Sequence, residues 1–338
     1  MINEFSKYKS RRELVKEHYE LIGDALVEKE RGNVSKSNIL RERAVNLGLD
    51  LVRLDKTNES DDLIQESHLR FLSRCRLLNI DNYVIDSFIG AGKCGAVYKA
   101  RDLNDETDAA LKILFYPRNP EEKERFINEG DKTYELESPH LVEGYKPTKK
   151  ITGAPIYWYS MELLDESTSL SIYVANNRLK DVLTIMSGVC DGLSVIHKNG
   201  LVHRDLHMDN IVITADNTPK ILDFGTIPVS DHGFTFRPVG SLKVCSPEKV
   251  KSPSTVSAPS DMFSVGCIVY KVASGEWPLY GKNFGEKVQL LTDCDPPPLN
   301  LEDEALVQLV DELLRMEPAA RPTAEEASSR FSTLAESR

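Results

Sequence analysis

The sequence predicts an α+β fold, with a β-rich lobe at about residues 81–162 and a mainly helical lobe at about residues 165–338. Short apolar runs on both sides of a glycine-rich turn indicate strands in the first lobe. Helix-forming runs and a helix-capping pattern indicate helices in the second lobe. Apolar residues at helical spacing predict a further helical region over residues 1–80.

Length and composition indicate a globular cytoplasmic protein. The chain has 338 residues, of which 41% are hydrophobic and 28% charged, and this length leaves room for two lobes and an extension. No apolar run approaches the roughly 20 residues needed to span a bilayer, and the N-terminus lacks a signal-peptide core. The six cysteines form no CxxC pair, so neither structural zinc nor a disulfide framework is expected, and no membrane association is predicted.

The net charge of −11 is unevenly distributed. Residues 1–80 hold 15 Lys and Arg against 14 Asp and Glu, which leaves 27 against 39 for residues 81–338. This acidic balance argues against a nucleic-acid partner and is compatible with basic partners. Improved solubility is the simpler explanation of the excess.

Amphipathic helices are predicted in the N-terminal region. Apolar residues recur at helical spacing over residues 15–26 and again over residues 40–54. A third helix is expected over residues 61–78. The apolar stripes need a cover, and two interpretations are open: a helical extension packed on the small lobe, or a module for docking or dimerisation.

A glycine-rich turn opens the β-rich lobe. Residues 90–97 read Gly-Ala-Gly-Lys-Cys-Gly-Ala-Val and fit the pattern G-x-G-x-x-G-x-V. Apolar runs flank it at residues 83–85 and 97–98, which predicts a strand–turn–strand unit rather than the strand–turn–helix of a dinucleotide site. Glycines let backbone amides approach phosphate oxygens closely. Residues 109–112, Ala-Ala-Leu-Lys, follow on a predicted strand.

A helix and a strand complete this lobe. Asn119 is a helix cap, Pro120 suits the first helical position, and two glutamates follow at the positive end of the helix. The predicted helix carries Glu129 and ends at the Ser-Pro pair of residues 138–139. Residues 156–164 predict the next strand.

One stretch of the helical lobe carries the residues suited to chemistry. After a predicted helix over residues 182–198, residues 203–210 read His-Arg-Asp-Leu-His-Met-Asp-Asn, and residues 223–225 read Asp-Phe-Gly. Between them, residues 211–214 and 220–222 predict two short strands joined by a tight turn. This hairpin would place two carboxylates and a carboxamide along one edge of a cleft.

These side chains can accept a proton and hold a divalent metal. Asp205 and Asp223 supply carboxylates, and Asn210 supplies a carboxamide, all of them hard oxygen donors. The order and separation of the His-Arg-Asp and Asp-Phe-Gly segments resemble the catalytic centre of the eukaryotic-type protein kinase family. The glycine turn and the Ala-Ala-Leu-Lys segment resemble the same family.

Three further features separate this resemblance from small-molecule kinases. Residues 246–248 read Ser-Pro-Glu where the family has Ala-Pro-Glu, and residues 261–266 resemble the start of a long family helix. Arg321 matches the arginine that pairs with that glutamate, and a capping box follows it. The resemblance covers about residues 83–335 and implies the bilobal protein kinase fold, with a helix called αC in the small lobe.

The resemblance implies transfer of the ATP γ-phosphoryl group to protein Ser or Thr hydroxyls, including those of the kinase itself. Asp205 would be the catalytic base, Asn210 and Asp223 would bind Mg²⁺, and Mn²⁺ is the alternative metal. Lys112 would contact the phosphates and pair with Glu129 of the αC helix. The residues implied in nucleotide binding are Ile89, Gly90, Gly92, Gly95, Val97, Ala110, Lys112, Met161, Glu162, Leu164, Val212 and Leu222. His203 would be a packing residue despite the reputation of histidine as a base.

Departures from the family pattern affect the substrate class. His207 stands where many Ser/Thr kinases have lysine, and Lys243 stands where tyrosine kinases often have a basic residue.

A pseudokinase or scaffold that binds nucleotide or partners without phosphoryl transfer is the second interpretation of the sequence. The protein substrate itself is not predicted, and residues 1–80 are the expected place for a docking partner or homodimer.

Activation is expected to involve the segment at residues 223–248. By resemblance, Arg204 would receive a phosphate from this segment, because a guanidinium binds phosphate bidentately. Ser230 and Thr235 are the candidate phosphorylation sites, and Thr235 is nearer the substrate-binding loop. Arg237 occupies the position where such kinases often carry the phosphorylated threonine, so the loop could instead be ordered without phosphate.

Overall fold

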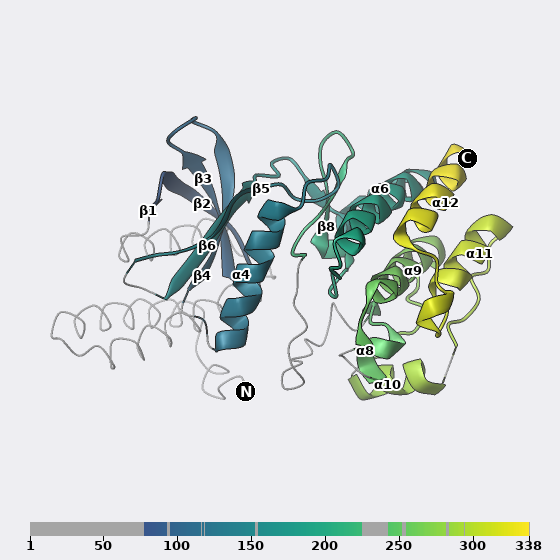
Figure 1. The fold of residues 1–338 in the computed structure, drawn as a ribbon. Coiled ribbons are helices and arrows are strands. Elements are labelled where there is room, and N and C mark those ends of the chain that lie inside the picture. The colour runs from purple at the N-terminus through teal and green to yellow at the C-terminus, as the bar shows by residue number, and fades with distance from the viewer. Residues whose placement is uncertain are drawn as a thin grey trace, which may run out of the picture. The chain divides into compact units, whose positions relative to one another are not determined.

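The computed structural model describes residues 78–92, 95–115, 117, 119–152, 155–224, 243–251, 255–281, 284–293 and 295–337. The helices predicted before residue 78 lie outside these residues. Figure 1 shows strands and helices that divide into two compact units. The first unit ends at Phe126 and resumes over Thr148–Leu163, and the second comprises Ile127–Pro147 and Leu164–Arg338. The predicted α+β class is confirmed.

The sheet of six strands has the order β1-β2-β3-β4-β6-β5. Its strands are β1 (Asn79–Ile80), β2 (Tyr83–Gly92), β3 (Gly95–Asp102), β4 (Asp108–Phe115), β5 (Gly144–Lys150) and β6 (Ile156–Glu162). The pairs from β1 to β4 and the β4–β6 pair are antiparallel. The strand–turn–strand prediction for the glycine turn is therefore confirmed.

The two faces of this sheet have different roles. One face carries an apolar cluster in which Tyr83 meets Trp158 edge-on at 5.8 Å and Phe88 meets Tyr98 at 5.6 Å. Directly paired residues of antiparallel strands project to the same face, and so do alternate residues of one strand. Lys112 pairs with Val97 and Tyr159, so these three side chains share the opposite face.

Helix α4 (Pro120–Glu135) begins where the sequence predicts and ends before the predicted boundary at Ser138 and Pro139. Asn119 caps it, because its Oδ1 accepts a hydrogen bond of 2.8 Å from the N–H of Glu122. Phe126 is fully buried, and its ring lies 5.3 Å from that of Tyr159 in β6. The division between the units falls within this helix.

The second unit is mainly helical. A small sheet has the order β7-β8-β9, with β7 at Thr168–Ser169, β8 at Ile211–Ile213 and β9 at Pro219–Ile221. The helices are α5 (Leu170–Asn176), α6 (Leu179–Lys198), α8 (Pro247–Lys251), α9 (Ala258–Ser274), α10 (Phe284–Asp293), α11 (Glu304–Leu313) and α12 (Ala324–Glu336), with 3₁₀ turns η2 (Met208–Asn210) and η4 (Pro318–Ala320). Helix α6 begins at Leu179, earlier than the predicted Val182.

Helix α9 lies at the centre of this unit. Its residues from Ser260 to Tyr270 are all buried. Gly275 caps its C-terminal end, has φ of 80° and donates its N–H to the carbonyl of Lys271. In α12, Thr323 and Glu326 form the predicted capping box. None of the described helices combines the length and apolar character needed to cross a bilayer.

Candidate functional site

One buried carboxylate holds the loop that carries the predicted catalytic residues. Asp261 of α9 accepts hydrogen bonds from the backbone N–H groups of His203, at 2.8 Å, and Arg204, at 2.9 Å. His197 of α6 places Nε2 2.9 Å from the same carboxylate. Arg204 has φ of 67°, a left-handed conformation that costs a residue with a side chain about 1–2 kcal/mol. Asp261 therefore stabilises an unusual backbone directly before Asp205.

The ionised form of Asp261 is favoured despite its burial. Burial alone would raise the pKa of Asp261, but the hydrogen bond and charge of His197, together with His203, hold it below its ordinary value of 3.8. In the sequence, Asp261 was identified only as the first residue of the segment 261–266 that resembles a family helix, and its contacts were not predicted. Its partners lie between 57 and 64 residues away along the chain, so no local sequence pattern predicts these contacts.

The geometry of His203 agrees with a packing role. The side chain is fully buried. Its Nδ1 lies 3.3 Å from the N–H of Asp205 and accepts that hydrogen bond, so Nε2 carries the proton and donates to the carbonyl of Leu222 at 2.9 Å. With both ring nitrogens engaged, His203 connects the loop of residues 203–210 to the chain before Asp223.

The β8–β9 hairpin gathers the three residues predicted to carry the chemistry. The N–H of Leu222 donates to the carbonyl of Asn210 at 2.9 Å, which brings the start of β8 beside the residue preceding Asp223. Asn210 Nδ2 donates to the carbonyl of Asp205 at 3.0 Å. This bond fixes the amide so that Oδ1 remains available as an acceptor. Asp223 is exposed and has φ of 56°.

The donor set at this hairpin fits Mg²⁺. Asp223 offers carboxylate oxygens and Asn210 an amide oxygen. Among the described residues, no group of three His, Cys, Asp or Glu side chains is placed to hold a metal. Mg²⁺ does not need such a cage, because it takes one or two protein carboxylates and completes its shell with phosphate and water oxygens.

The glycine turn lies between β2 and β3 of the first unit. Gly90 pairs with Val97, and Gly92 with Gly95. Gly95 has φ of 126°, and a Cβ there would lie 2.5 Å from the carbonyl oxygen of Ile113. Only glycine fits this position without a shift of the backbone. The tip of the turn, at residues 93–94, lies outside the described residues.

Lys112 is a buried cation on the sheet face opposite the apolar cluster. Only 4% of its surface is exposed, and a buried charge requires a partner. Ala110 lies two residues before it on β4 and pairs with Met161 of β6, so both share the face of Lys112 and Val97. One face of the first unit thus presents four of the predicted nucleotide-contacting residues.

The remaining predicted residues divide between the units. Ile89, which is 52% exposed, and Glu162 belong to the first unit. The second unit holds Glu129, which is 4% exposed, and Leu164, whose carbonyl accepts a hydrogen bond of 2.6 Å from Ser167 Oγ. The second unit also holds Val212 and Leu222, both half-buried.

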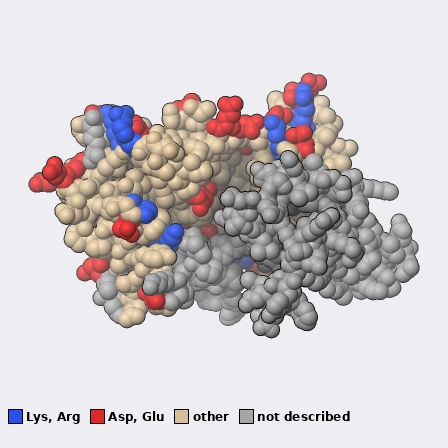
Figure 2. Space-filling model, turned by 180° about the vertical axis from the view of Figure 1, so that it is seen from behind, with Lys and Arg blue, Asp and Glu red and all other residues tan. Residues whose placement is uncertain are grey.

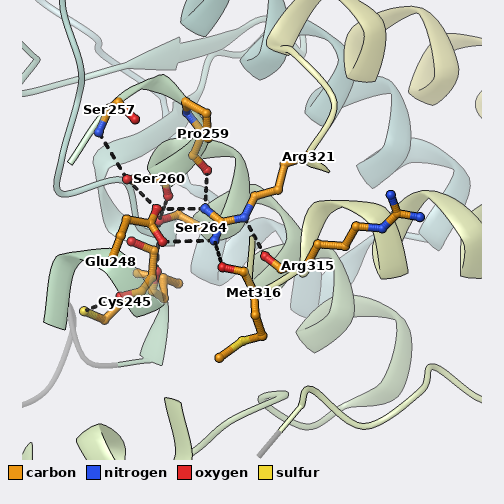
Figure 3. Close-up of polar contacts among 11 residues, drawn as sticks. Cys245, Glu248, Ser257, Pro259, Ser260, Ser264, Arg315, Met316 and Arg321 are labelled. Atoms are coloured by element: carbon orange, nitrogen blue, oxygen red, sulfur yellow. Dashed lines mark hydrogen bonds and ion pairs between the residues drawn. The ribbon is translucent and has the colours of Figure 1, made fainter. Parts of the chain in front are cut away.

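A buried ion pair joins the segment after residue 243 to the C-terminal part of the second unit. Arg321 Nη1 lies 2.8 Å from Glu248 Oε1, and Arg321 Nη2 lies 3.0 Å from Oε2 (Figure 3). Ser260 Oγ donates to the same carboxylate at 2.6 Å. Burial alone would raise the pKa of Glu248, but Arg321 and Ser260 hold it below its ordinary value of 4.5. The pair predicted from the sequence is confirmed.

Every donor of this guanidinium has a partner. Besides the two bonds to Glu248, the Arg321 side chain donates to the carbonyls of Arg315 at 2.7 Å, Pro259 at 2.8 Å and Met316 at 3.3 Å. Its Cζ lies 4.9 Å from the centre of the Phe263 ring. Because a guanidinium has five N–H groups, the burial of Arg321 leaves none unsatisfied.

We expect Arg321→Met to destabilise the protein by about 3–5 kcal/mol, because it leaves the carboxylate of Glu248 buried and unpaired. Urea unfolding measures this change. Arg330→Met is the matched control, since Arg330 pairs with Glu312 at a more exposed site and its loss should cost about 1 kcal/mol or less. Equal losses in the two variants would contradict the importance assigned to the buried pair.

Comparison with known proteins agrees with this geometry. The family model described as protein kinase domain matches residues 83–331. The chain belongs to the protein kinase family. This kinase is 31% identical over 268 residues to the serine/threonine-protein kinase PknB of Mycobacterium tuberculosis, an alignment that covers 76% of the chain and 42% of the relative. It is 29% identical over 267 residues to PknB of Mycobacterium leprae, with the same coverages.

A third relative extends the similarity to another genus. The kinase is 28% identical over 253 residues to PknA of Corynebacterium glutamicum, which covers 71% of the chain and 53% of that protein. The chain thus spans less than half the length of the PknB relatives and about half of PknA. All three relatives are described as serine/threonine-protein kinases.

Proposed function

We propose that this kinase transfers the γ-phosphoryl group of ATP to Ser and Thr hydroxyls of protein substrates and of itself. The observation that carries the proposal is the anchored catalytic loop. Asp261 holds the backbone before Asp205, and the β8–β9 hairpin gathers Asp205, Asn210 and the chain leading to Asp223. The Ser/Thr class is supported by the relatives, which are serine/threonine-protein kinases.

In this proposal each polar residue has one role. Asp205 accepts the proton of the substrate hydroxyl, while Asn210 Oδ1 and Asp223 hold Mg²⁺, with Mn²⁺ as an alternative. The bound metal supplies positive charge that stabilises the phosphate oxygens. Lys112 orients the α- and β-phosphates, and the backbone around Gly90 and Gly95 approaches the phosphate oxygens. Ala110, Val97 and the residues at the end of β6 contact the adenine.

We also propose that α4 is the αC helix of the family and that Glu129 pairs with Lys112. Both side chains are charged and almost completely buried, and Glu129 lies one helical turn after Phe126, whose ring contacts Tyr159 in the strand beside Lys112. Burying a charge without a partner is costly, which supports the pairing of these two.

Lys112→Met is expected to lower kcat by at least about 100-fold while changing ATP affinity much less, because the lysine orients phosphates rather than holding adenine. Initial rates and equilibrium nucleotide binding separate the two effects. Lys149→Met is the control, since Lys149 lies on β5 and pairs with the exposed Asp81. Full activity in Lys112→Met would mean that another lysine, such as Lys93, takes the role.

The substrate class depends on the loop around His207. Its Nδ1 accepts a hydrogen bond of 3.3 Å from the N–H of Asp209 and caps the η2 turn. We expect His207→Lys to keep Ser/Thr specificity and to lose about 1 kcal/mol of stability, because lysine cannot accept this bond. Peptide mapping of the phosphorylated products measures the specificity, and phosphotyrosine as the main product would overturn the Ser/Thr class.

The proposal also includes regulation through Arg204 and partner binding through the N-terminal helices. The Arg204 guanidinium donates no hydrogen bond to any residue that the structure describes. Burial lowers its pKa because it disfavours the charged form. A phosphate from the activation segment would be a favourable partner, because its negative charge stabilises the charged guanidinium. The candidates Ser230 and Thr235, with Arg237, lie outside the described residues, as do the helices proposed for docking or dimerisation before residue 78. A cytoplasmic location stays a prediction.

A direct test is incubation of the purified chain with γ-labelled ATP and Mg²⁺, alone and with a general protein substrate. We expect label in protein, and none when EDTA removes the divalent metal. ATP binding without any transfer would overturn the proposed activity and favour the pseudokinase interpretation. Label in a small metabolite but not in protein would favour a small-molecule kinase.

A further inference from the structure

A groove of about 540 Å³ lies in the second unit, bounded by α9, α11 and the loop before α11. Its apolar lining includes Leu299, Val310 and Leu314, which are 6%, 1% and 3% exposed. Residues 296–298, three successive prolines, form one wall. Proline restricts the backbone and offers no N–H. The backbone of this wall is therefore restricted before any ligand enters, which lowers the entropy lost on binding.

A largely buried tyrosine belongs to this groove. Tyr270 lines it and is 7% exposed. Within the described part of the chain its phenol oxygen makes no hydrogen bond, and it is not among the completely enclosed unsatisfied atoms. Because Tyr270 lines the groove, its hydroxyl is the polar group that this side chain offers to a ligand there. Burial raises the pKa of Tyr270, so the phenol stays protonated at neutral pH and can both donate and accept a hydrogen bond.

Carboxylates are in excess around the groove. Asp295, Glu304 and Asp311 line it and are exposed, against the single cation Arg315. Arg315 Nη1 is directed to the carbonyl of Ala320 at 3.4 Å. The three carboxylates make no hydrogen bond or ion pair with any residue in the described ranges.

The net charge of residues 81–338 has the same sign as this excess. Residues 81–338 carry 27 Lys and Arg against 39 Asp and Glu. On the face seen in Figure 2, the Lys and Arg side chains of the described residues form small separate groups, with Asp and Glu between them. A net negative charge of this region favours the approach of a cationic partner.

We propose that this groove is a docking site for a cationic segment of a partner protein. A Lys or Arg side chain of the partner lies among the carboxylates of Asp295, Glu304 and Asp311. Its aliphatic stem, or a neighbouring apolar side chain, covers the floor at Leu299 and Leu314. The Tyr270 hydroxyl accepts a hydrogen bond from that cation or from a backbone N–H of the segment.

The composition of the groove excludes simpler occupants. A hydrated metal ion would fill only part of this volume and would gain nothing from an apolar floor. An anion would be repelled by the carboxylates. A peptide that alternates cationic and apolar side chains satisfies the floor, the carboxylates and the phenol together, and its binding does not depend on phosphoryl transfer.

The test measures binding to the full chain directly. The probe is a short fluorescein-labelled peptide of alternating lysine, leucine and glycine, compared with the same peptide carrying glutamate for lysine, by fluorescence anisotropy. We expect saturable binding of the lysine peptide, at least about tenfold tighter than the glutamate peptide, and weaker binding as salt is raised.

Three variants locate the binding. The triple change Asp295→Asn, Glu304→Gln and Asp311→Asn should lower affinity about tenfold. Tyr270→Phe removes only the hydroxyl and should lower affinity about fivefold. The control is Glu302→Gln, Glu317→Gln and Glu336→Gln, which removes three exposed carboxylates that do not line the groove; its affinity should stay within about twofold of the wild type.

Several outcomes would overturn the proposal. The first is that the lysine peptide shows no saturable binding. The second is that the control triple variant loses as much affinity for the peptide as the groove triple variant, which would indicate general charge attraction. A third is self-association of the wild type in sedimentation equilibrium that the groove triple variant abolishes, since a second copy would then be the occupant. Thermal unfolding of each variant confirms that its fold is intact.

Discussion

Replacing Asp223 or Asp205 by alanine is expected to lower the rate of phosphoryl transfer by at least about 100-fold while leaving the fold intact. Loss of a catalytic base or of a metal-holding carboxylate typically costs this much or more. Asp223 is exposed and Asp205 half-buried, and neither fills the apolar core, so the free energy of unfolding should change little. Initial rates with γ-labelled ATP and thermal unfolding measure the two quantities.

Asp209→Asn is the matched control for these variants. Asp209 lies in the same loop, is exposed, and accepts a hydrogen bond of 2.7 Å from Ser171 Oγ. Its carboxylate has no role in the proposed chemistry, so this variant should retain most of the activity. Wild-type turnover in Asp223→Ala would contradict the assignment of the metal site, and inactive Asp209→Asn would show that the loop tolerates no change of charge.

Asp261→Ala is expected to reduce both stability and activity. It leaves the buried N–H groups of His203 and Arg204 without acceptors, and each unsatisfied group costs about 1–3 kcal/mol. The left-handed backbone of Arg204 then loses its support, so kcat of the remaining folded protein should also fall. Asp261→Asn keeps one carbonyl acceptor and should lie between the wild type and the alanine variant.

The pH dependence of stability gives a second test of Asp261. Its pKa in the folded protein lies below the ordinary value of 3.8, so its contribution is complete above that value and is lost as the pH falls through the lower folded pKa. Acid unfolding of the wild type should therefore depend more steeply on pH in this range than that of Asp261→Asn. Asp181→Ala is the control, because Asp181 is in an exposed pair with Arg178. Identical acid unfolding of wild type and Asp261→Asn would contradict this account.

Local sequence patterns predicted the secondary-structure elements that depend on residues close together in the chain. The helix start at Asn119, the capping box at Thr323 and the hairpin between residues 211 and 221 all depend on neighbours a few positions apart. The pair of Glu248 and Arg321 was predicted only through the family resemblance, because 73 residues separate the two. Periodicity alone could not have indicated it.

The contacts that hold the catalytic loop could not be predicted in this way. Asp261 contacts His197 and the backbone of His203 and Arg204, and these contacts require α6 and α9 to be packed together first. The groove beside Tyr270 likewise depends on how the proline segment returns over α9 and α11. The early start of α6 at Leu179 places the helix boundary directly after Arg178, where the sequence offers no standard cap.

The central claim is that this chain catalyses phosphoryl transfer to Ser and Thr through Asp205. The most direct measurement is mass-spectrometric mapping of phosphopeptides after wild type and Asp205→Asn are each incubated with ATP and Mg²⁺ under the same conditions. We expect phosphoserine and phosphothreonine in the wild type and almost none in the variant. An unphosphorylated wild type that nevertheless binds ATP, or equal phosphorylation in the two proteins, would contradict it.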